Sequence, residues 1–151
     1  MKRLLLPAAV AAGLYLVLMQ LHEAPRPFEP TVPVEAPAAA RSDDAIGRAF
    51  ADRRSNVQVQ ASGAVVKVLV DDEDGSRHQR FIVQLPSGQT VLIAHNTDLA
   101  PRVAPLSAGD TVEFKGEYEW NDKGGVVHWT HRDPARSHPG GWIRRDGATF
   151  Q

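Results

Sequence analysis

Side chains that can transfer protons lie in three short segments of the chain, at 77–80, 95–102 and 128–138. Cleavage of a phosphodiester needs a base to activate water, an acid for the leaving group and a cation for the phosphate charge. His95 and His131 are the candidate acid and base, and Asp133 could orient an imidazole. We therefore predict His95, His131 and Asp133 as the catalytic residues of such an enzyme.

The last of these segments also has donor groups for a metal ion. In an extended chain His131 and Asp133 point the same way, and His138 follows Pro134 and could fold back as a third ligand. Imidazole with carboxylate suits zinc, manganese, nickel or iron, so a divalent metal is a candidate cofactor. The spacing matches no HExxH or HxH motif. The alternative is that these histidines hydrogen-bond the loop backbone.

Binding of an anionic ligand is the third use of these segments. A guanidinium group can hold a phosphate through two parallel hydrogen bonds, and indole rings can stack on bases. The predicted ligand-binding residues are Arg77, His78, Arg80, Asn96, Asp98, Arg102, Trp129 and Trp142. Ordinary core packing is the alternative for the tryptophans. Glu113, Glu117 and Glu119 would form an acidic strand face that repels phosphates.

The amino-acid composition excludes some classes of function. The 151 residues include 17 Lys and Arg against 18 Asp and Glu, for a net charge of −1. A charge this close to zero argues against a protein that coats DNA or acidic membranes by bulk attraction. The chain has no cysteine, which excludes disulfides, a thiol nucleophile and Cys-based metal sites.

The N-terminus predicts export. Lys2 and Arg3 precede an uncharged apolar stretch over 4–19. Basic residues keep that end in the cytoplasm, and no pair of small residues follows the stretch as a cleavage site. We therefore expect residues 1–23 to be a retained single-pass anchor in the inner membrane of a bacterium, with the rest of the chain in the periplasm. Cleavage and secretion is the alternative.

The remaining chain divides into a linker and one domain. Five prolines over 24–41 predict an extended linker, because proline removes backbone donors. The domain over 42–151 is expected to open with a short helix capped by Ser42. Strands with alternating apolar residues follow, with Val66, Val68 and Val70 on one face and Val127 with Trp129 on another.

Gly63 is expected to mark a bulge or bend, and Asp146-Gly147 the turn of a small hairpin. Five main strands with one longer connection, between the third and the fourth, predict an all-β fold. The prediction is a small OB-like five-stranded barrel with a short N-terminal helix. A two-layer β-sandwich is the runner-up.

Four separated stretches carry a family resemblance: 75–81, 94–102, 116–120 and 128–138 with Trp142. They resemble the bacterial domain-of-unknown-function family 3465 over about residues 56 to 151. The resemblance implies a small exported domain and carries no assigned activity, but it favours one shared site for the polar segments.

These observations predict a membrane-anchored periplasmic domain with a His/Arg/Asp pocket for an anionic ligand, either nucleic acid or a phosphate-bearing molecule. A metal-dependent phosphodiester hydrolase and a structural adaptor presented on a stalk are the alternatives. The sequence identifies no protein partner, and the membrane contact would be made by the N-terminal segment.

Overall fold

A computed structural model describes residues 38–151, with side chains from residue 45 onward. The predicted anchor over 1–23 and most of the predicted linker lie outside the described residues. Across residues 38–151, no helix combines the length and the apolar character needed to cross a membrane.

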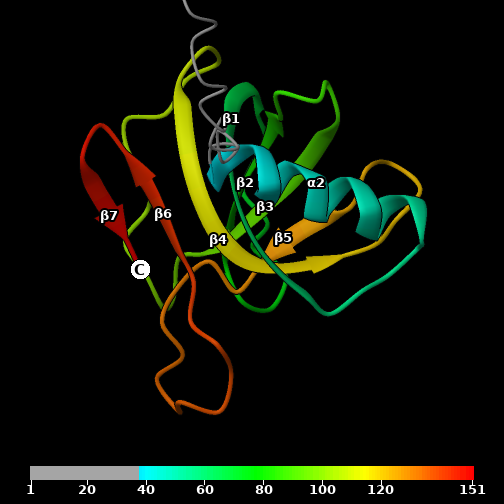
Figure 1. Cartoon of the computed structure of the whole chain (residues 1–151). Helices are drawn as coiled ribbons and strands as arrows, with labels where there is room; N and C mark the ends of the chain where they lie inside the picture. The colour runs from blue at the N-terminus through cyan, green and yellow to red at the C-terminus, as the bar shows by residue number, and fades with distance from the viewer. Residues whose placement is uncertain (1–37) are drawn as a thin grey trace, which may run out of the picture. The chain divides into compact units, whose positions relative to one another are not determined.

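The first described element is helix α2 (Ala38–Ala51), which runs across the barrel in Figure 1. It begins four residues before Ser42, so the predicted helix cap at Ser42 is wrong. Three consecutive alanines, strong helix formers, extend the helix into the predicted linker. Ile46 and Ala49 are 0% and 3% exposed and join the barrel core, so this helix closes part of the apolar interior.

Five strands form the barrel: β1 (Val57–Val68), β2 (His78–Gln84), β3 (Thr90–Asn96), β4 (Thr111–Glu119) and β5 (Val126–His128). Their order is β1-β2-β3-β5-β4, and β4 pairs back with β1 to close the sheet. The β3–β5 pair is parallel and the others are antiparallel. This order is that of an OB-type barrel, so the predicted fold is confirmed and the sandwich alternative is not.

Two short strands continue the sheet beyond β4. They are β6 (Trp142–Arg145) and β7 (Ala148–Phe150), joined at Asp146 and Gly147. Both turn residues have positive φ, 48° and 78°, as a tight hairpin turn of this kind requires. The predicted hairpin is therefore confirmed.

The alternation along the strands sorts most residues correctly into core and surface. Phe81, Val83, Val91 and Ile93 are fully buried or nearly so. Strand β1 differs, because its pairing with β2 shifts between Val65 and Lys67.

This bulge changes which residues of β1 face the core. Val65 is 1% exposed, whereas Val66 is 42% and Val70 84% exposed. The predicted shared face of Val66, Val68 and Val70 is therefore wrong. Gly63 lies where β1 passes from β4 to β2, and a Cβ there would lie 2.3 Å from the carbonyl oxygen of Gln84. The predicted bend at this glycine thus reflects a close backbone approach, while the bulge lies further along.

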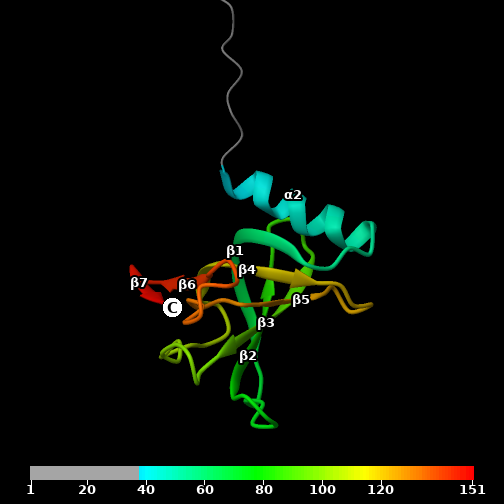
Figure 2. The same cartoon turned by 90° about the horizontal axis from the view of Figure 1, so that it is seen from below.

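Helix α2 and the β1–β2 loop lie at opposite ends of the barrel (Figure 2). The segment 129–141, called here the β5–β6 loop, is the long irregular orange segment in Figure 1. It carries four of the predicted site residues, Trp129, His131, Asp133 and His138, and leads back to β6 beside β4.

Candidate functional site

A groove of about 330 Å³ lies over the outer face of β2, β3 and β5, and it is called the groove below. Its lining includes His78, Asn96, His128, Trp129 and His131. His78 and Asn96 are direct cross-strand partners, which places their side chains on the same face. The fold thus brings together residues from all three polar segments of the sequence.

His78 and His131 both line the groove and share one hydrogen-bonding pattern, and His131 is only 4% exposed. The Nδ1 of His78 lies 2.7 Å from the carbonyl oxygen of Ser76, and the Nδ1 of His131 lies 2.7 Å from that of Arg132. A carbonyl oxygen only accepts, so each Nδ1 carries the hydrogen. Each Nε2 has no hydrogen-bond partner among the described residues.

Trp129 leaves the sheet at the end of β5. Its φ of 53° lies in the left-handed region, which bulky residues rarely adopt. The prediction that Trp129 shares a strand face with Val127 is therefore wrong. Its ring instead stacks on His138, with centroids 4.0 Å apart and planes inclined by 15°. The strained backbone turns the indole toward the groove, and unusual backbone of this kind is concentrated at functional sites.

His95 lies inside the barrel rather than in the groove. It is 0% exposed, and its ring nitrogens lie 2.9 Å from Thr130 Oγ1 and 3.1 Å from the carbonyl oxygen of Pro101. Burial lowers the pKa of His95 to about 4, against a weaker opposing effect of the Pro101 contact. A neutral, enclosed ring has no atom left for a substrate, which argues against the predicted catalytic role. Through Thr130 it fixes the start of the segment that carries His131.

Asp133 organises the β5–β6 loop. Its carboxylate accepts hydrogen bonds from the backbone amides of Ala135, Ser137 and His138 at 2.7–2.9 Å, and from Ser137 Oγ at 3.0 Å. These bonds, led by the His138 amide, lower the pKa of Asp133 to about 2. A carboxylate held in this way shapes its own loop, which argues against its predicted roles in catalysis and metal binding.

The predicted metal ligands His131, Asp133 and His138 do not form a compact donor set. Within the described residues they do not place three donor atoms within 4.8 Å of one another. His138 instead faces β4, where its Nε2 lies 2.9 Å from Glu117 Oε2.

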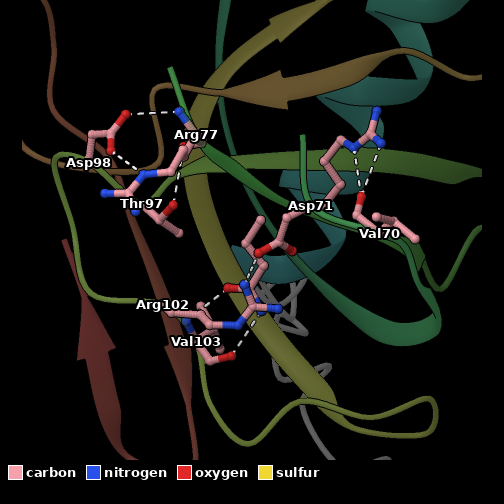
Figure 3. Close-up of polar contacts among 9 residues, drawn as sticks. Val70, Asp71, Arg77, Thr97, Asp98, Arg102 and Val103 are labelled. Atoms are coloured by element: carbon pink, nitrogen blue, oxygen red, sulfur yellow. Dashed lines mark hydrogen bonds and ion pairs between the residues drawn. The ribbon is translucent and has the colours of Figure 1, made fainter. Parts of the chain in front are cut away.

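The three predicted phosphate-binding arginines contact other parts of the protein, and Figure 3 labels two of them, Arg77 and Arg102. Arg77 donates from Nε to Asp98 Oδ1 at 2.7 Å, and Arg102 pairs with Asp71. Arg80 donates from two nitrogens to the carbonyl oxygen of Val70, at 3.1 and 3.0 Å.

These contacts tie the β1–β2 loop to its neighbours. Hydrogen bonds from the backbone amide and side chain of Arg77 lower the pKa of Asp98, which keeps that carboxylate charged. The predicted ligand residues Arg77, Arg80, Asp98 and Arg102 therefore fix the loops beside the groove. Trp142, also predicted to bind ligand, lies on β6. The Arg144 guanidinium lies over its indole ring, with the guanidinium carbon 4.1 Å from the ring centroid.

Sequence reasoning missed a second polar cluster on the outside of β4 and β5. Donor atoms of Glu117, Glu119 and His128 all lie within 4.8 Å of one another. The two glutamates are separated by one residue on a strand, so they share a face, but we interpreted them only as an acidic surface. Their pairing with His128 depends on the β4–β5 register, which local sequence does not reveal.

The closed strand order and the groove on its outer face define the class of this protein: a small OB-like β-barrel domain. The family described as "Protein of unknown function (DUF3465)" matches residues 31–151. The chain therefore belongs to this family, and the resemblance seen in the sequence is confirmed. The search of curated proteins gave no match.

Proposed function

We propose that this domain binds a phosphate-bearing ligand, a nucleotide or a short stretch of single-stranded nucleic acid, in the groove. The observation that supports the proposal most is the arrangement of His78 and His131, whose Nε2 atoms are free beside Asn96 and Trp129. With Nδ1 donating to a carbonyl, each Nε2 accepts a hydrogen bond from a base edge when the ring is neutral and donates one to a phosphate oxygen when the ring is protonated. The Asn96 amide can donate and accept, and the indole offers a surface for a base.

Size and position agree with this proposal. The volume of about 330 Å³ lies at the lower end of small-molecule sites, which span roughly 300–1,000 Å³. Such a space suits one nucleotide unit rather than a long polymer. OB barrels bind oligonucleotides and oligosaccharides over the face that includes β2 and β3, and the groove lies on that face.

Binding of a labelled single-stranded oligonucleotide to the full-length protein tests the proposal. We expect His131→Asn and Asn96→Ala each to weaken binding at least about tenfold, because each removes a hydrogen bond to a charged or polar ligand. Trp129→Phe is a further groove variant. Its matched control is Trp142→Phe, because Trp129 lines the groove and Trp142 does not. Equal affinity of wild-type protein and the groove variants would contradict the proposal.

Competition separates the two sources of phosphate. Adenosine 5′-monophosphate, adenosine and inorganic phosphate are added in turn against the labelled oligonucleotide. Displacement by the monophosphate at concentrations where adenosine and inorganic phosphate do not compete identifies a site for a single nucleotide. Displacement by unlabelled oligonucleotide alone identifies a nucleic-acid site, and no binding of any phosphate-bearing probe would overturn the proposal.

A metal-dependent phosphodiester hydrolase is the second candidate. His128 favours it, because this residue lines the groove and also belongs to the cluster with Glu117 and Glu119. An ion there would lie beside a bound phosphodiester and could activate water. Release of p-nitrophenol from bis(p-nitrophenyl) phosphate, with added Mn²⁺ and after chelation, tests this candidate. No metal-stimulated release would reject it.

From the sequence we further propose that residues 1–23 anchor the domain in the inner membrane with the barrel in the periplasm. The supporting observation is the basic pair before an uncharged apolar stretch. Protease treatment of spheroplasts checks it: the barrel should be digested, and its protection would contradict the proposed orientation.

A further inference from the structure

We propose that Glu117, Glu119 and His128 bind a divalent transition-metal ion of the zinc type. This site goes beyond the proposed function, because ion binding by these residues does not depend on a phosphate ligand. It also differs from the His131, Asp133 and His138 set that the sequence suggests.

The register of β4 and β5 builds the donor set. Glu117 lies directly opposite His128, and Glu119 lies two residues along the same outward face. His128 Nε2 is 3.8 Å from Oε1 of each glutamate. Zinc bonds of about 2.1 Å in tetrahedral geometry separate ligand atoms by roughly 3.4 Å. Both imidazole–carboxylate distances therefore exceed this value by only a few tenths of an ångström, and the donor atoms of the two glutamates lie within 4.8 Å of each other.

The Nε2 of His128 is an unexplained polar atom. It is inaccessible to solvent and has no hydrogen-bond partner in the described part of the chain. Buried polar atoms are nearly always hydrogen-bonded, so an exception requires a reason. An ion between the two glutamates would satisfy this nitrogen.

The charges around Glu117 and Glu119 also favour a bound cation. Glu113, on the same strand, is paired with the guanidinium of Arg144 at 4.0 Å. The ion-pair partners of Glu117 and Glu119 are imidazoles, those of His128 and His138. Two adjacent carboxylates repel each other, and a divalent cation between them would balance both charges.

The carboxylate of Glu117 is also held in place through its second oxygen, Oε2. Its Oε2 accepts a hydrogen bond from Gln58 Nε2 at 3.0 Å and lies 2.9 Å from His138 Nε2. The stack of His138 on Trp129 fixes that imidazole in turn. Hydrogen bonds to the second oxygen of a ligating carboxylate are characteristic of metal sites, because they set the direction of the first oxygen.

The donor chemistry selects the ion class. One imidazole and two carboxylates suit zinc and its neighbours better than calcium, which prefers oxygen ligands alone. Three protein ligands leave a coordination position for water or a ligand atom. Since His128 lines the groove, the ion would also place positive charge at the rim of the groove.

Titration of the chelator-stripped full-length protein with Co²⁺, followed by visible absorption and then by Zn²⁺ competition, tests the site. We expect one ion per chain with the absorption of a low-coordinate complex. Glu119→Gln and His128→Asn should weaken binding at least a hundredfold. Gln58→Ala, which acts through Glu117, should weaken it about tenfold. Glu113→Gln is the matched control and should leave binding unchanged.

Three outcomes would overturn the inference: no cobalt spectrum, wild-type affinity in Glu119→Gln, or an equal loss in Glu113→Gln. Circular dichroism verifies that each variant is folded, and Glu119 is partly exposed, so its replacement by glutamine keeps the strand. The probe is the metal alone. Failure of this test therefore leaves the phosphate proposal standing, and failure of the oligonucleotide test leaves the metal site standing.

Discussion

His95 connects the interior of the barrel to the groove at the scale of one residue. Its ring lies among core side chains, yet both nitrogens are used, by Thr130 and by the carbonyl oxygen of Pro101. Thr130 directly precedes His131, and Pro101 belongs to the β3–β4 connection. A single buried imidazole therefore holds two loops that flank the site, which makes His95 a positioning residue.

The buried state of His95 predicts acid sensitivity. Its pKa is about 4 in the folded protein, below the ordinary 6.5, so between these values the unfolded chain binds a proton that the folded chain does not. Stability should therefore fall as the pH falls from 6.5 to 4. The contribution amounts to roughly 3 kcal/mol. Urea unfolding across this range, compared between the wild type and His95→Gln, measures it.

The difference between the two proteins isolates His95, because their other titrating groups are the same. The wild type should lose more stability than His95→Gln on acidification, since glutamine cannot take up the proton. Parallel stability curves would show that His95 does not carry this pH dependence.

Residue types in the sequence indicate where the site lies, but not which charges are free. The segments at 77–80, 95–102 and 128–138 were recognisable, and the groove draws His78, Asn96, Trp129 and His131 from them. The pairing of Arg77 with Asp98 joins two loops that are distant in sequence. Arg77 and Asp98 are both predicted to bind ligand, because the sequence shows the charge of a residue but not the partner that it pairs with.

Strand β4 is the element that organises both sides of the barrel wall. Its inward residues include Phe114 and Tyr118, both 0% exposed, while its outward face carries the glutamates of the proposed ion site. The register of those glutamates with β5 depends on the turn at Gly124 and Gly125, which have φ of 112° and 92°. This turn therefore sets the geometry of the ion site.

Gly125→Ala should destabilise the fold strongly. A Cβ there would lie 2.2 Å from Cε2 of the Tyr118 ring, in addition to the cost of a positive φ. Gly88 is the matched control, because its φ is 88° and no atom lies within 4 Å of an added Cβ.

Gly88→Ala should cost about 1–2 kcal/mol from backbone strain alone. Gly125→Ala should cost about 1–3 kcal/mol more from overpacking. Urea unfolding of both variants measures the difference. Equal losses would mean that Tyr118 moves aside freely and that the turn does not depend on this contact.

Alternation of apolar residues was sufficient to predict the strands, because burial of one face requires it. It failed where the backbone departs from the regular ladder. The bulge in β1 reverses the faces after Val65, and β5 ends at His128 so that Trp129 leaves the sheet. Both departures are set by partner strands, which a period along one segment does not encode.

At the scale of the molecule, closure of the barrel explains how a cysteine-free chain keeps a defined site. The pairing of β1 with β4 removes the open sheet edges between these strands and joins the buried residues into one core cluster. The groove and the proposed ion site lie on the outside of this wall and share His128. The net charge of −1 conceals this local arrangement of imidazoles and carboxylates.

Imidazole NMR spectra of the full-length protein, recorded during titration with adenosine 5′-monophosphate, show whether the groove binds the nucleotide. Histidine-to-glutamine variants assign the signals. We expect the signals of His78 and His131 to move together with one dissociation constant, while those of the enclosed His95 stay in place. Saturating binding without movement of His78 and His131 would contradict the assignment of the groove as the ligand site, and so would the absence of binding by both the monophosphate and the oligonucleotide.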